Sequence, residues 1–274
     1  AKAKKDKFYT QLEDIEHELR HYKAFFKDKI VLCNCDDPIE SQFFFHFAML
    51  FNHYELKKLI VTSYADSPIM GDLFNPYQGK AAYKLEVNEF KDWNGDGAED
   101  WADIEYALAH GIYKCEELHG DEKYCAGDFR SKECLELLKR ADVVVTNPPF
   151  SLFREFIATL IEHDKKFLIV GNKNAITYKE IFPLIKNDKL WTGFNGWSGG
   201  LWFISDHENY YDKIVDDVYL KNVASIWYTN IRTSKFEDTI PLFREYYKTP
   251  ELYPRYDNYD AIEVSRTADI PEDY

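Results

Sequence analysis

The sequence lacks a hydrophobic run long enough to cross a bilayer. Its longest apolar stretch, residues 43–51, is nine residues long and is interrupted by His46, whereas a transmembrane helix needs about 20 residues. The charged start, residues 1–6, leads into no hydrophobic segment of the kind found in secretory signals. We therefore expect no membrane partner and a cytoplasmic protein.

Cysteine is also scarce, with five residues in 274 and no regular spacing. An odd number of irregularly spaced cysteines disfavours a disulfide framework and fits a reducing compartment. Cys115, His119 and Cys125 lie near one another in the sequence, but they lack the paired spacing and the fourth ligand of a zinc site. We interpret these thiols as buried or incidental.

Basic charge is in deficit, since 34 Lys and Arg face 48 Asp and Glu and the net charge is −14. Most of the excess lies in residues 86–122, which hold 12 acidic residues and two lysines. A protein that binds nucleic acid needs cations against the phosphates, so a basic face has to lie outside this stretch. Its candidates are Lys165, Lys166, Lys173, Lys179, Arg232 and Lys235.

One segment of the acidic stretch, residues 92–103, follows the pattern of a calcium-binding loop at several positions. Oxygen ligands fall at loop positions 1, 3, 5, 9 and 12, and Gly97 takes the turn position. A structural calcium ion and a polar turn without an ion are both open interpretations, and neither is catalytic. The ligands of the calcium hypothesis are Asp92, Asn94, Asp96, Asp100 and Asp103.

Short buried strands alternate with amphipathic helices through the first two thirds of the chain. Residues 30–33, 59–62, 141–146 and 167–171 are apolar and β-branched, while residues 10–26, 41–52 and 152–163 carry helical periodicity. Such alternation predicts an α/β fold with a mostly parallel sheet covered on both faces. We expect a core over residues 1–184, with an acidic insertion at about 75–124, and further strands with target-recognition elements over 185–274.

The most informative segment is Asn147-Pro148-Pro149-Phe150, placed directly after a buried strand and before a helix. The amino group of a nucleobase is a poor nucleophile because its lone pair is delocalised into the ring. The Asn147 side-chain oxygen and the Pro148 carbonyl would each accept one of its N–H groups and localise that pair, and consecutive prolines hold the carbonyl rigid. Phe150 would stack on the ring of a flipped base. The motif predicts methyl transfer to an amino group conjugated with a ring or a carbonyl.

The sequence resembles the EcoRI-type family of adenine-specific DNA methyltransferases. The matching strings are residues 8–11, 31–38, 127–131, 145–155 and 167–182. The resemblance implies a Rossmann-like class I methyltransferase with a mostly parallel seven-stranded sheet, flanking helices and insertions. It also implies site-specific N6 methylation of a flipped adenine in double-stranded DNA, with S-adenosylmethionine as the donor.

The resemblance further assigns residues to the donor. Tyr9 and Thr10 match the N-terminal contact, and Asp128 and Phe129 match the pair that holds the adenine of the donor. The turn after the first buried strand would hold its methionine end, although it contains no G-x-G, and the usual acid for the ribose is missing from residues 62–64, with Asp66 two residues on. The donor residues of this turn are Cys33, Asn34, Asp36, Asp37 and Pro38, of which Asp36 or Asp37 would bind the ammonium group.

Other functions stay open at this stage. The same motif suits a methyltransferase for RNA adenine or for a glutamine amide of a protein, and an acidic chain without G-x-G also suits a non-catalytic module that binds the donor or DNA. A calcium-regulated interaction domain is a third interpretation. The polar end, residues 266–274, suggests a chain that stops short of a complete domain. We also expect a monomer or a weak dimer. The aromatic residues expected to contact bases or to fill a core are Trp191, Trp197, Trp202, Trp227 and Tyr228.

Overall fold

A computed structural model describes residues 9–35, 41–64, 82–196, 199–205, 210–215, 218–237, 241–258 and 260–274. The chain forms two compact units, residues 1–232 and residues 233–274, and each is described by itself. Among the described helices, none has the length and apolar character needed to span a membrane.

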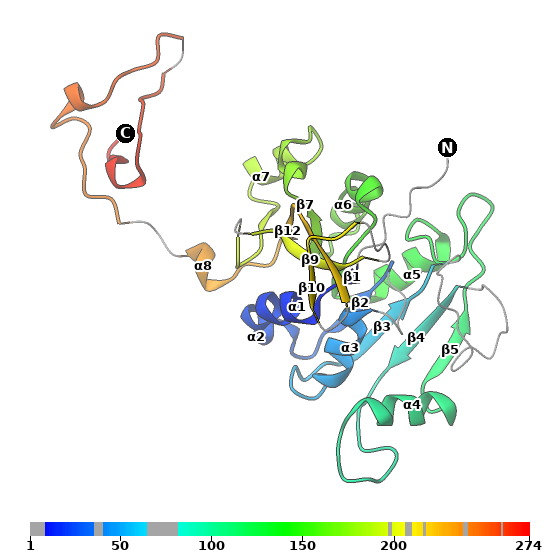
Figure 1. Ribbon diagram of the computed structural model, residues 1–274. Coiled ribbons are helices and arrows are strands. Elements are labelled where there is room, and N and C mark those ends of the chain that lie inside the picture. Colours follow the sequence, from blue (N-terminus) through cyan, green and yellow to red (C-terminus); the bar gives the residue numbers. More distant parts are fainter. Residues whose placement is uncertain are drawn as a thin grey trace. The chain divides into compact units, whose positions relative to one another are not determined.

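The larger unit is built on an eight-stranded sheet with the strand order β5-β4-β3-β2-β6-β7-β12-β8 (Figure 1). Four neighbouring strands, β3, β2, β6 and β7, run parallel, and the four outer strands pair antiparallel. The strands are β2 (Ile30–Cys33), β3 (Lys58–Thr62), β4 (Tyr83–Val87), β5 (Lys114–Glu117), β6 (Val143–Thr146), β7 (Lys166–Asn172), β8 (Trp191–Thr192) and β12 (Ser225–Thr229).

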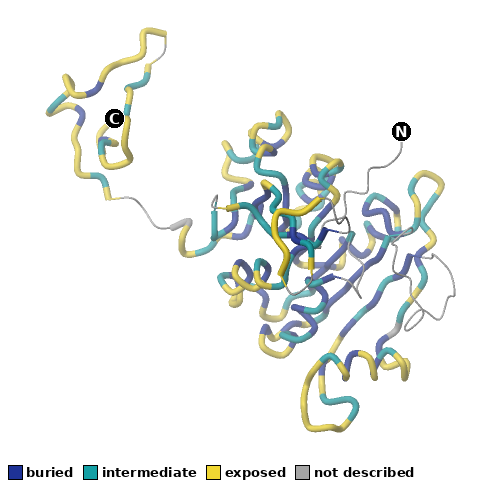
Figure 2. Tube along the Cα trace, in the orientation of Figure 1, coloured by how far each residue is buried: buried dark blue, intermediate teal, exposed yellow. Residues whose placement is uncertain are grey.

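Helices cover both faces of this sheet, and its central strands are therefore buried on both sides. Alternate strand residues enter two separate core clusters, so that Val143 and Val145 belong to the first and Val144 to the second. The first cluster is covered by α1 (Leu12–Leu19), α2 (Lys23–Phe26), α3 (Gln42–Met49) and α4 (Trp101–Ala109). The second is covered by α5 (Lys132–Arg140), α6 (Phe153–Glu162) and α7 (Phe182–Lys186). Figure 2 shows the buried strands between more exposed helices.

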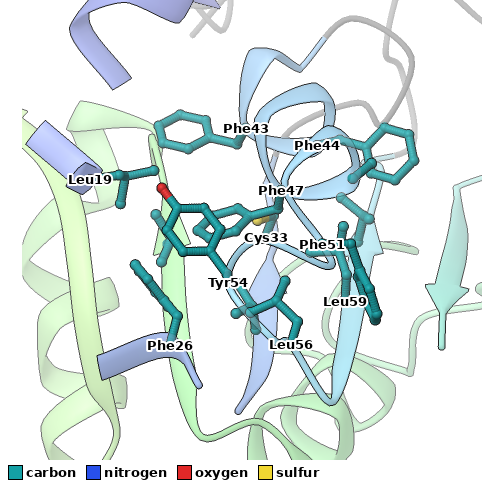
Figure 3. Close-up of a cluster of buried hydrophobic side chains, with 14 of the residues drawn as sticks. Leu19, Phe26, Cys33, Phe43, Phe44, Phe47, Phe51, Tyr54, Leu56 and Leu59 are labelled. Atoms are coloured by element: carbon teal, nitrogen blue, oxygen red, sulfur yellow. The ribbon is translucent and has the colours of Figure 1, made fainter. Parts of the chain in front are cut away.

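The first cluster is rich in aromatic rings. Leu19 and Phe26, from the N-terminal helices, lie against Phe43 and Phe47 of α3 (Figure 3). The ring centroids of Phe26 and Phe47 are 5.2 Å apart in an edge-to-face arrangement, which aromatic pairs favour. The helix expected over residues 10–26 is therefore present, but a 3₁₀ turn, η1 (Arg20–Tyr22), divides it into α1 and α2.

The expected α/β class and the four parallel strands are confirmed, whereas a mostly parallel seven-stranded sheet is wrong. The sheet has eight strands and is mixed because the acidic segment itself supplies β4 and β5. In β4, buried and half-buried residues alternate, which is the pattern of an antiparallel strand with one open face. At the other side, β12 runs antiparallel to β7 and β8 pairs with β12.

A second, antiparallel sheet in the larger unit has the order β1-β9-β11-β10. Its strands are β1 (Tyr9–Thr10), β9 (Leu201–Ile204), β10 (Lys213–Val215) and β11 (Val218–Val223). The sheet joins the start of the chain to residues near 200, because Tyr9 pairs with Ile204 and Thr10 with Phe203.

The smaller unit has little regular structure. It contains α8 (Ser234–Glu237), η4 (Pro250–Leu252) and η5 (Thr267–Asp269). Tyr246 packs on Tyr253 and Tyr274. Of the further strands expected within residues 185–274, the described part of this unit contains only isolated bridges, such as that between Arg255 and Ile262. Among the described residues of the smaller unit no sheet forms, and the aromatic cluster around Tyr246 packs its segments together.

Candidate functional site

The carboxyl ends of β3, β2, β6 and β7 meet at one edge of the large sheet. The chain moves from β2 to β3 in one direction and from β6 to β7 in the other. In open α/β sheets, ligands bind at such a reversal of strand order, beyond the carboxyl ends. The residues that follow these strands are therefore the candidates for a site, and they include Asn34, Ser63, Asn147 and Lys173.

The segment Asn147–Phe150 lies at this edge. It follows β6, in which every residue is buried, and it leads through η2 (Phe150–Leu152) into α6. Asn147 is half-buried, Pro148 is buried and Pro149 is exposed, while Phe150 is half-buried and packs against the first core cluster. The strand thus delivers one amide side chain, one rigid carbonyl and one aromatic ring to the same edge.

The turn after β2 lies beside this segment. The Thr146 hydroxyl donates a hydrogen bond to the backbone carbonyl of Asn34, so the ends of β2 and β6 are joined. The side-chain oxygen Oδ1 of Asn34 is buried and has no hydrogen-bond partner among the described residues. A buried acceptor without a partner costs free energy unless a ligand donates to it. Cys33 itself is buried in the first core cluster.

Cys35 adopts a left-handed backbone conformation, with φ of 69°. Such a conformation disfavours residues that carry a Cβ and is ordinary for glycine. The turn therefore has the backbone requirement of a glycine-rich loop without a glycine at this position. Asp36, Asp37 and Pro38 lie outside the described residues.

The Asp128 loop packs against the end of β3. Gly127 has φ of +78°, and a Cβ placed on it would lie 2.0 Å from the backbone oxygen of Ser63, so only glycine allows this approach. The carboxylate of Asp128, with 8% of its side chain exposed, is held by Arg130. This ion pair raises the pKa of Arg130 further above its usual value. Asp128 therefore belongs to the same edge as Asn34.

Phe129 is placed differently from its expected role as a surface for adenine. Its ring is 5% exposed and belongs to the second core cluster. It meets Phe156 edge to face, with 4.9 Å between the ring centroids. The ring supports the Asp128 loop from within, and its contact with a donor stays a prediction.

The end of β3 has a buried hydroxyl near the position where an acidic residue for the ribose of the donor was expected. Thr62 is 1% exposed, and its Oγ1 has no hydrogen-bond partner in the part of the chain that the structure describes. Ser63 is occupied, since its hydroxyl accepts a hydrogen bond from the backbone of Tyr83 at 2.9 Å. Asp66 lies outside the described residues.

Tyr9 and Thr10 lie in the small antiparallel sheet rather than at the strand ends of the large one. Thr10 is 3% exposed, and its hydroxyl has no partner within the described ranges. The segment is fastened through α1, in which the buried carboxyl group of Glu18 accepts hydrogen bonds from the backbone amides of Phe194 and Asn195 at 2.5 and 3.0 Å. The role of Tyr9 and Thr10 in binding the donor stays a prediction.

The acidic loop is closed by its own backbone. The Asp92 carboxylate accepts hydrogen bonds from the amides of Gly95, Asp96 and Gly97. Asp103 is buried, and although burial raises its pKa, hydrogen bonds from the backbone of Asp100, Asn94 and Trp93 lower it below the usual value. No group of three or more His, Cys, Asp or Glu side chains suited to a metal ion occurs among the residues described. The structure therefore gives no support for a calcium ion at the five expected ligands, which are Asp92, Asn94, Asp96, Asp100 and Asp103.

The residues expected to form one basic face lie at opposite ends of the strands of the large sheet. Lys165 and Lys166 lie at the amino end of β7, and Arg232 follows β12, which runs antiparallel to β7. Lys165 is also occupied, because it donates to the carbonyls of residues 139 and 141 at 2.8 Å. Lys173 and Lys179 follow the carboxyl end of β7, on the side of Asn147, and Lys235 belongs to the smaller unit.

Two of the aromatic residues expected to contact bases or to fill a core lie in the core. Trp227 and Tyr228 are 4% and 0% exposed in the central part of β12. Trp191 is half-buried and donates to the carbonyl of Ile231 at 3.1 Å. Trp202 is half-buried beneath the Lys213 ammonium, 3.9 Å from its ring centre, and Trp197 lies outside the described residues. Base contacts by Trp191, Trp197 and Trp202 stay predictions.

Two residues of the site were missed in the sequence. Arg130 lies in a matching string, but no role was predicted for it. Its position two residues after Asp128 is the sequence feature that could have indicated their ion pair. Thr146 ends a run of three valines, where a single hydroxyl in an otherwise apolar strand marks a polar contact.

Comparisons with known proteins give one consistent result. The family described as "Adenine-specific methyltransferase EcoRI" matches residues 1–274. Among curated proteins, the type II methyltransferase M.EcoRI of Escherichia coli is 41% identical over 280 residues, covering 100% of this chain and 79% of the relative. M.MpnI of Mycoplasma pneumoniae and M.MgeORF184P of Mycoplasma genitalium, both type II methyltransferases, are 35% and 32% identical over all of this chain and 76% of their own lengths. No solved structure matches the chain.

Proposed function

Because the chain belongs to the EcoRI family of adenine-specific methyltransferases, we propose that the carboxyl edge of its large sheet is the methyl-transfer site. The chain is an adenine-specific type II DNA methyltransferase, and its activity belongs to restriction–modification. The single observation that carries the proposed site is the position of Asn147–Phe150, directly after β6 and beside the turn that follows β2.

The family implies S-adenosylmethionine as the methyl donor. The residues at the edge fit this group, because Asn34 Oδ1 and Thr62 Oγ1 are buried without partners among the described residues, and a donor with ammonium and hydroxyl groups supplies what they lack. When bound, the sulfonium of the donor supplies an electrophilic methyl group. Asn34 and the adjacent turn, residues 33–38, would hold its methionine end, and Asp128 its adenine amino group.

Asn147, Pro148 and Phe150 act on the target adenine. The Asn147 side-chain oxygen and the Pro148 carbonyl accept the two N–H groups of the exocyclic nitrogen and localise its lone pair toward the donor side. Pro149 holds the Pro148 carbonyl in a fixed direction, and Phe150 stacks on the flipped ring. No strong general base is needed, because the nitrogen becomes acidic as it is alkylated.

The partner in this proposal is double-stranded DNA, from which the adenine is flipped into the edge. A monomer or weak dimer of the chain would bind it, with residues 185–274 contributing to target recognition and residues 1–184 holding the donor and catalytic groups. The central strands β3, β2, β6 and β7 support a Rossmann-like class I architecture, since the proposed site lies at the reversal of their order.

The test is transfer of labelled methyl from S-adenosylmethionine to unmethylated duplex DNA, followed by digestion and identification of the nucleosides. N6-methyladenine from the wild type, and none from Asn147→Ala with donor affinity near normal, is the expected result. An Asn147→Ala enzyme that keeps the wild-type rate would refute the assignment of the site. Label in RNA or in protein, with none in DNA, would refute the substrate.

A further inference from the structure

The hydrogen bond between Thr146 and Asn34 joins two segments that are far apart in the sequence. In the parallel pair of β2 and β6, Leu32 lies opposite Val144, so residues 34 and 146 are level with each other just beyond the last paired residues. Thr146 Oγ1 donates to the Asn34 carbonyl there. Both residues are buried, with 0% and 5% of their surfaces exposed.

A hydroxyl at this position calls for an explanation. The three residues before it, Val143 to Val145, are valines and are each 0% exposed, and a fourth valine has nearly the shape of threonine. Burying a hydroxyl costs free energy unless it makes a hydrogen bond, and this one makes its bond outside its own strand. The contact therefore exists to join the ends of β2 and β6 rather than to fill the core.

The bond lies between the two halves of the proposed reaction. Asn34 lies in the turn assigned to the donor, and Thr146 immediately precedes Asn147, which is assigned to the target nitrogen. Displacement in line requires the nucleophile and the methyl group to be held at a fixed separation and direction, and a misplacement of about 1 Å can cost about 100-fold in rate. A contact that fixes the spacing of these two backbones fixes that separation as well.

We propose that Thr146 is a positioning residue for methyl transfer, whose hydroxyl sets the distance between the donor turn at Asn34 and the Asn147 loop. The inference rests on the proposed function of this edge. Thr146 touches neither reactant; it acts through the backbone of Asn34 and through its covalent neighbour Asn147. Its loss should slow the chemical step and leave the binding of each reactant nearly unchanged.

The experiment compares Thr146→Val, Thr146→Ser and Thr146→Cys with the wild type in the full chain. Single-turnover transfer from S-adenosylmethionine to unmethylated duplex DNA is measured with both reactants saturating, beside donor and DNA affinities and the melting temperature. Valine should lower the rate about 10- to 100-fold with affinities within about threefold. Serine keeps the hydroxyl and should stay within about threefold of the wild type. Cysteine, a weak donor of similar shape, should lie between them, and it serves in place of valine if that variant does not fold.

The outcomes separate this inference from the proposed function. A valine variant with a lower melting temperature and the wild-type single-turnover rate would assign Thr146 a purely structural role and overturn the proposal, and so would a serine variant as slow as valine. Asn147→Ala in the same assay reports on the site itself. If Asn147→Ala is inactive and Thr146→Val is not slowed, only the positioning role fails; if Asn147→Ala is fully active, the proposed site fails.

Discussion

Arg130 holds Asp128 through two parallel hydrogen bonds, from Nε to Oδ1 at 3.0 Å and from Nη2 to Oδ2 at 2.8 Å. A third side-chain hydrogen bond of Arg130 runs from Nη1 to Glu155 at 2.6 Å, in the first turn of α6. One guanidinium therefore connects the loop assigned to the adenine of the donor with the helix that follows Asn147–Phe150. A planar fork is required for this geometry, which lysine cannot supply.

Arg130→Lys should weaken the binding of S-adenosylmethionine about tenfold, the effect of losing one hydrogen bond to a charged group. The reason is that Asp128 would no longer be held in one orientation. At saturating donor the rate should change less than the affinity, because Arg130 touches neither the target base nor the Asn147 loop directly. Isothermal titration with the donor, together with steady-state kinetics, measures both quantities.

Arg20→Lys is the matched control for this change. Arg20 is exposed and its guanidinium donates to the neighbouring His21, so its replacement should leave donor binding unchanged. Equal donor affinity in the Arg130 and Arg20 variants would contradict the assignment of the Asp128 loop to the donor.

The backbone of Cys35 gives a second prediction. A residue with a Cβ in the left-handed region costs about 1 kcal/mol relative to glycine, so Cys35→Gly should be neutral or stabilising by up to about 1 kcal/mol. Cys35→Val adds a β-branched side chain at the same φ of 69° and should destabilise by about 1–3 kcal/mol. Urea unfolding of the wild type and the two variants gives the sign of the change in unfolding free energy for each substitution. A glycine variant that is clearly less stable than valine would show that the thiol's packing, and not the backbone, decides this position.

Much of the larger unit could be predicted from local sequence patterns, namely periodicity and one short motif. The valines of β6, the apolar face of α6 and the run Asn147–Phe150 each point to one element or edge, and the structure has them there. The strand β4 was not predicted, although its buried positions alternate with charged ones such as Lys84 and Glu86 in the manner of a half-buried strand. It is only five residues long and lies in an acidic segment that was interpreted as an insertion. A local pattern also cannot reveal a contact such as that of Glu18 with the amides of residues 194 and 195, because its partner lies about 176 residues away and nothing near Glu18 indicates it.

His46 gives a prediction for the dependence of stability on pH. It is 2% exposed in α3, its Nε2 lies 2.8 Å from the Tyr54 hydroxyl, and burial lowers its pKa from 6.5 to about 4. The folded state therefore binds a proton less readily than the unfolded state. Its contribution to stability is fully present above pH 6.5 and is lost progressively as the pH falls toward 4.

Between pH 7.5 and pH 5.0 the wild type should lose about 2 kcal/mol of unfolding free energy through His46. The measurement is urea unfolding at the two pH values for the wild type and for His46→Gln, which keeps a hydrogen-bonding group for Tyr54 and does not titrate in this range. The difference between the two losses isolates His46 from the other titrating groups. A glutamine variant with the same loss as the wild type would contradict a buried neutral histidine at this position.

Arg154 gives a prediction for the DNA-binding surface. It lies in the first turn of α6, four residues after Phe150. Its side chain is 56% exposed, and its Nε lies 3.9 Å from a carboxylate oxygen of Glu180. Its guanidinium stacks over the Tyr178 ring at 4.5 Å, which holds it at the carboxyl edge beside the residues that follow β7. In a chain with a net charge of −14, a cation held at this edge is suited to a phosphate close to the flipped base.

Arg154→Met should weaken duplex binding to a similar extent for every DNA sequence and should reduce the slope of log affinity against log salt by about 0.9, the value for one phosphate contact. Donor affinity should stay at the wild-type value. Lys139→Met is the control, because Lys139 is exposed in the last turn of α5, at the end of that helix that leads to the amino end of β6. Fluorescence anisotropy over a range of salt concentrations gives both slopes. An Arg154→Met slope equal to that of the wild type would exclude this phosphate contact, and a slope reduced equally by Lys139→Met would mean that the DNA is attracted by overall charge rather than bound at the carboxyl edge.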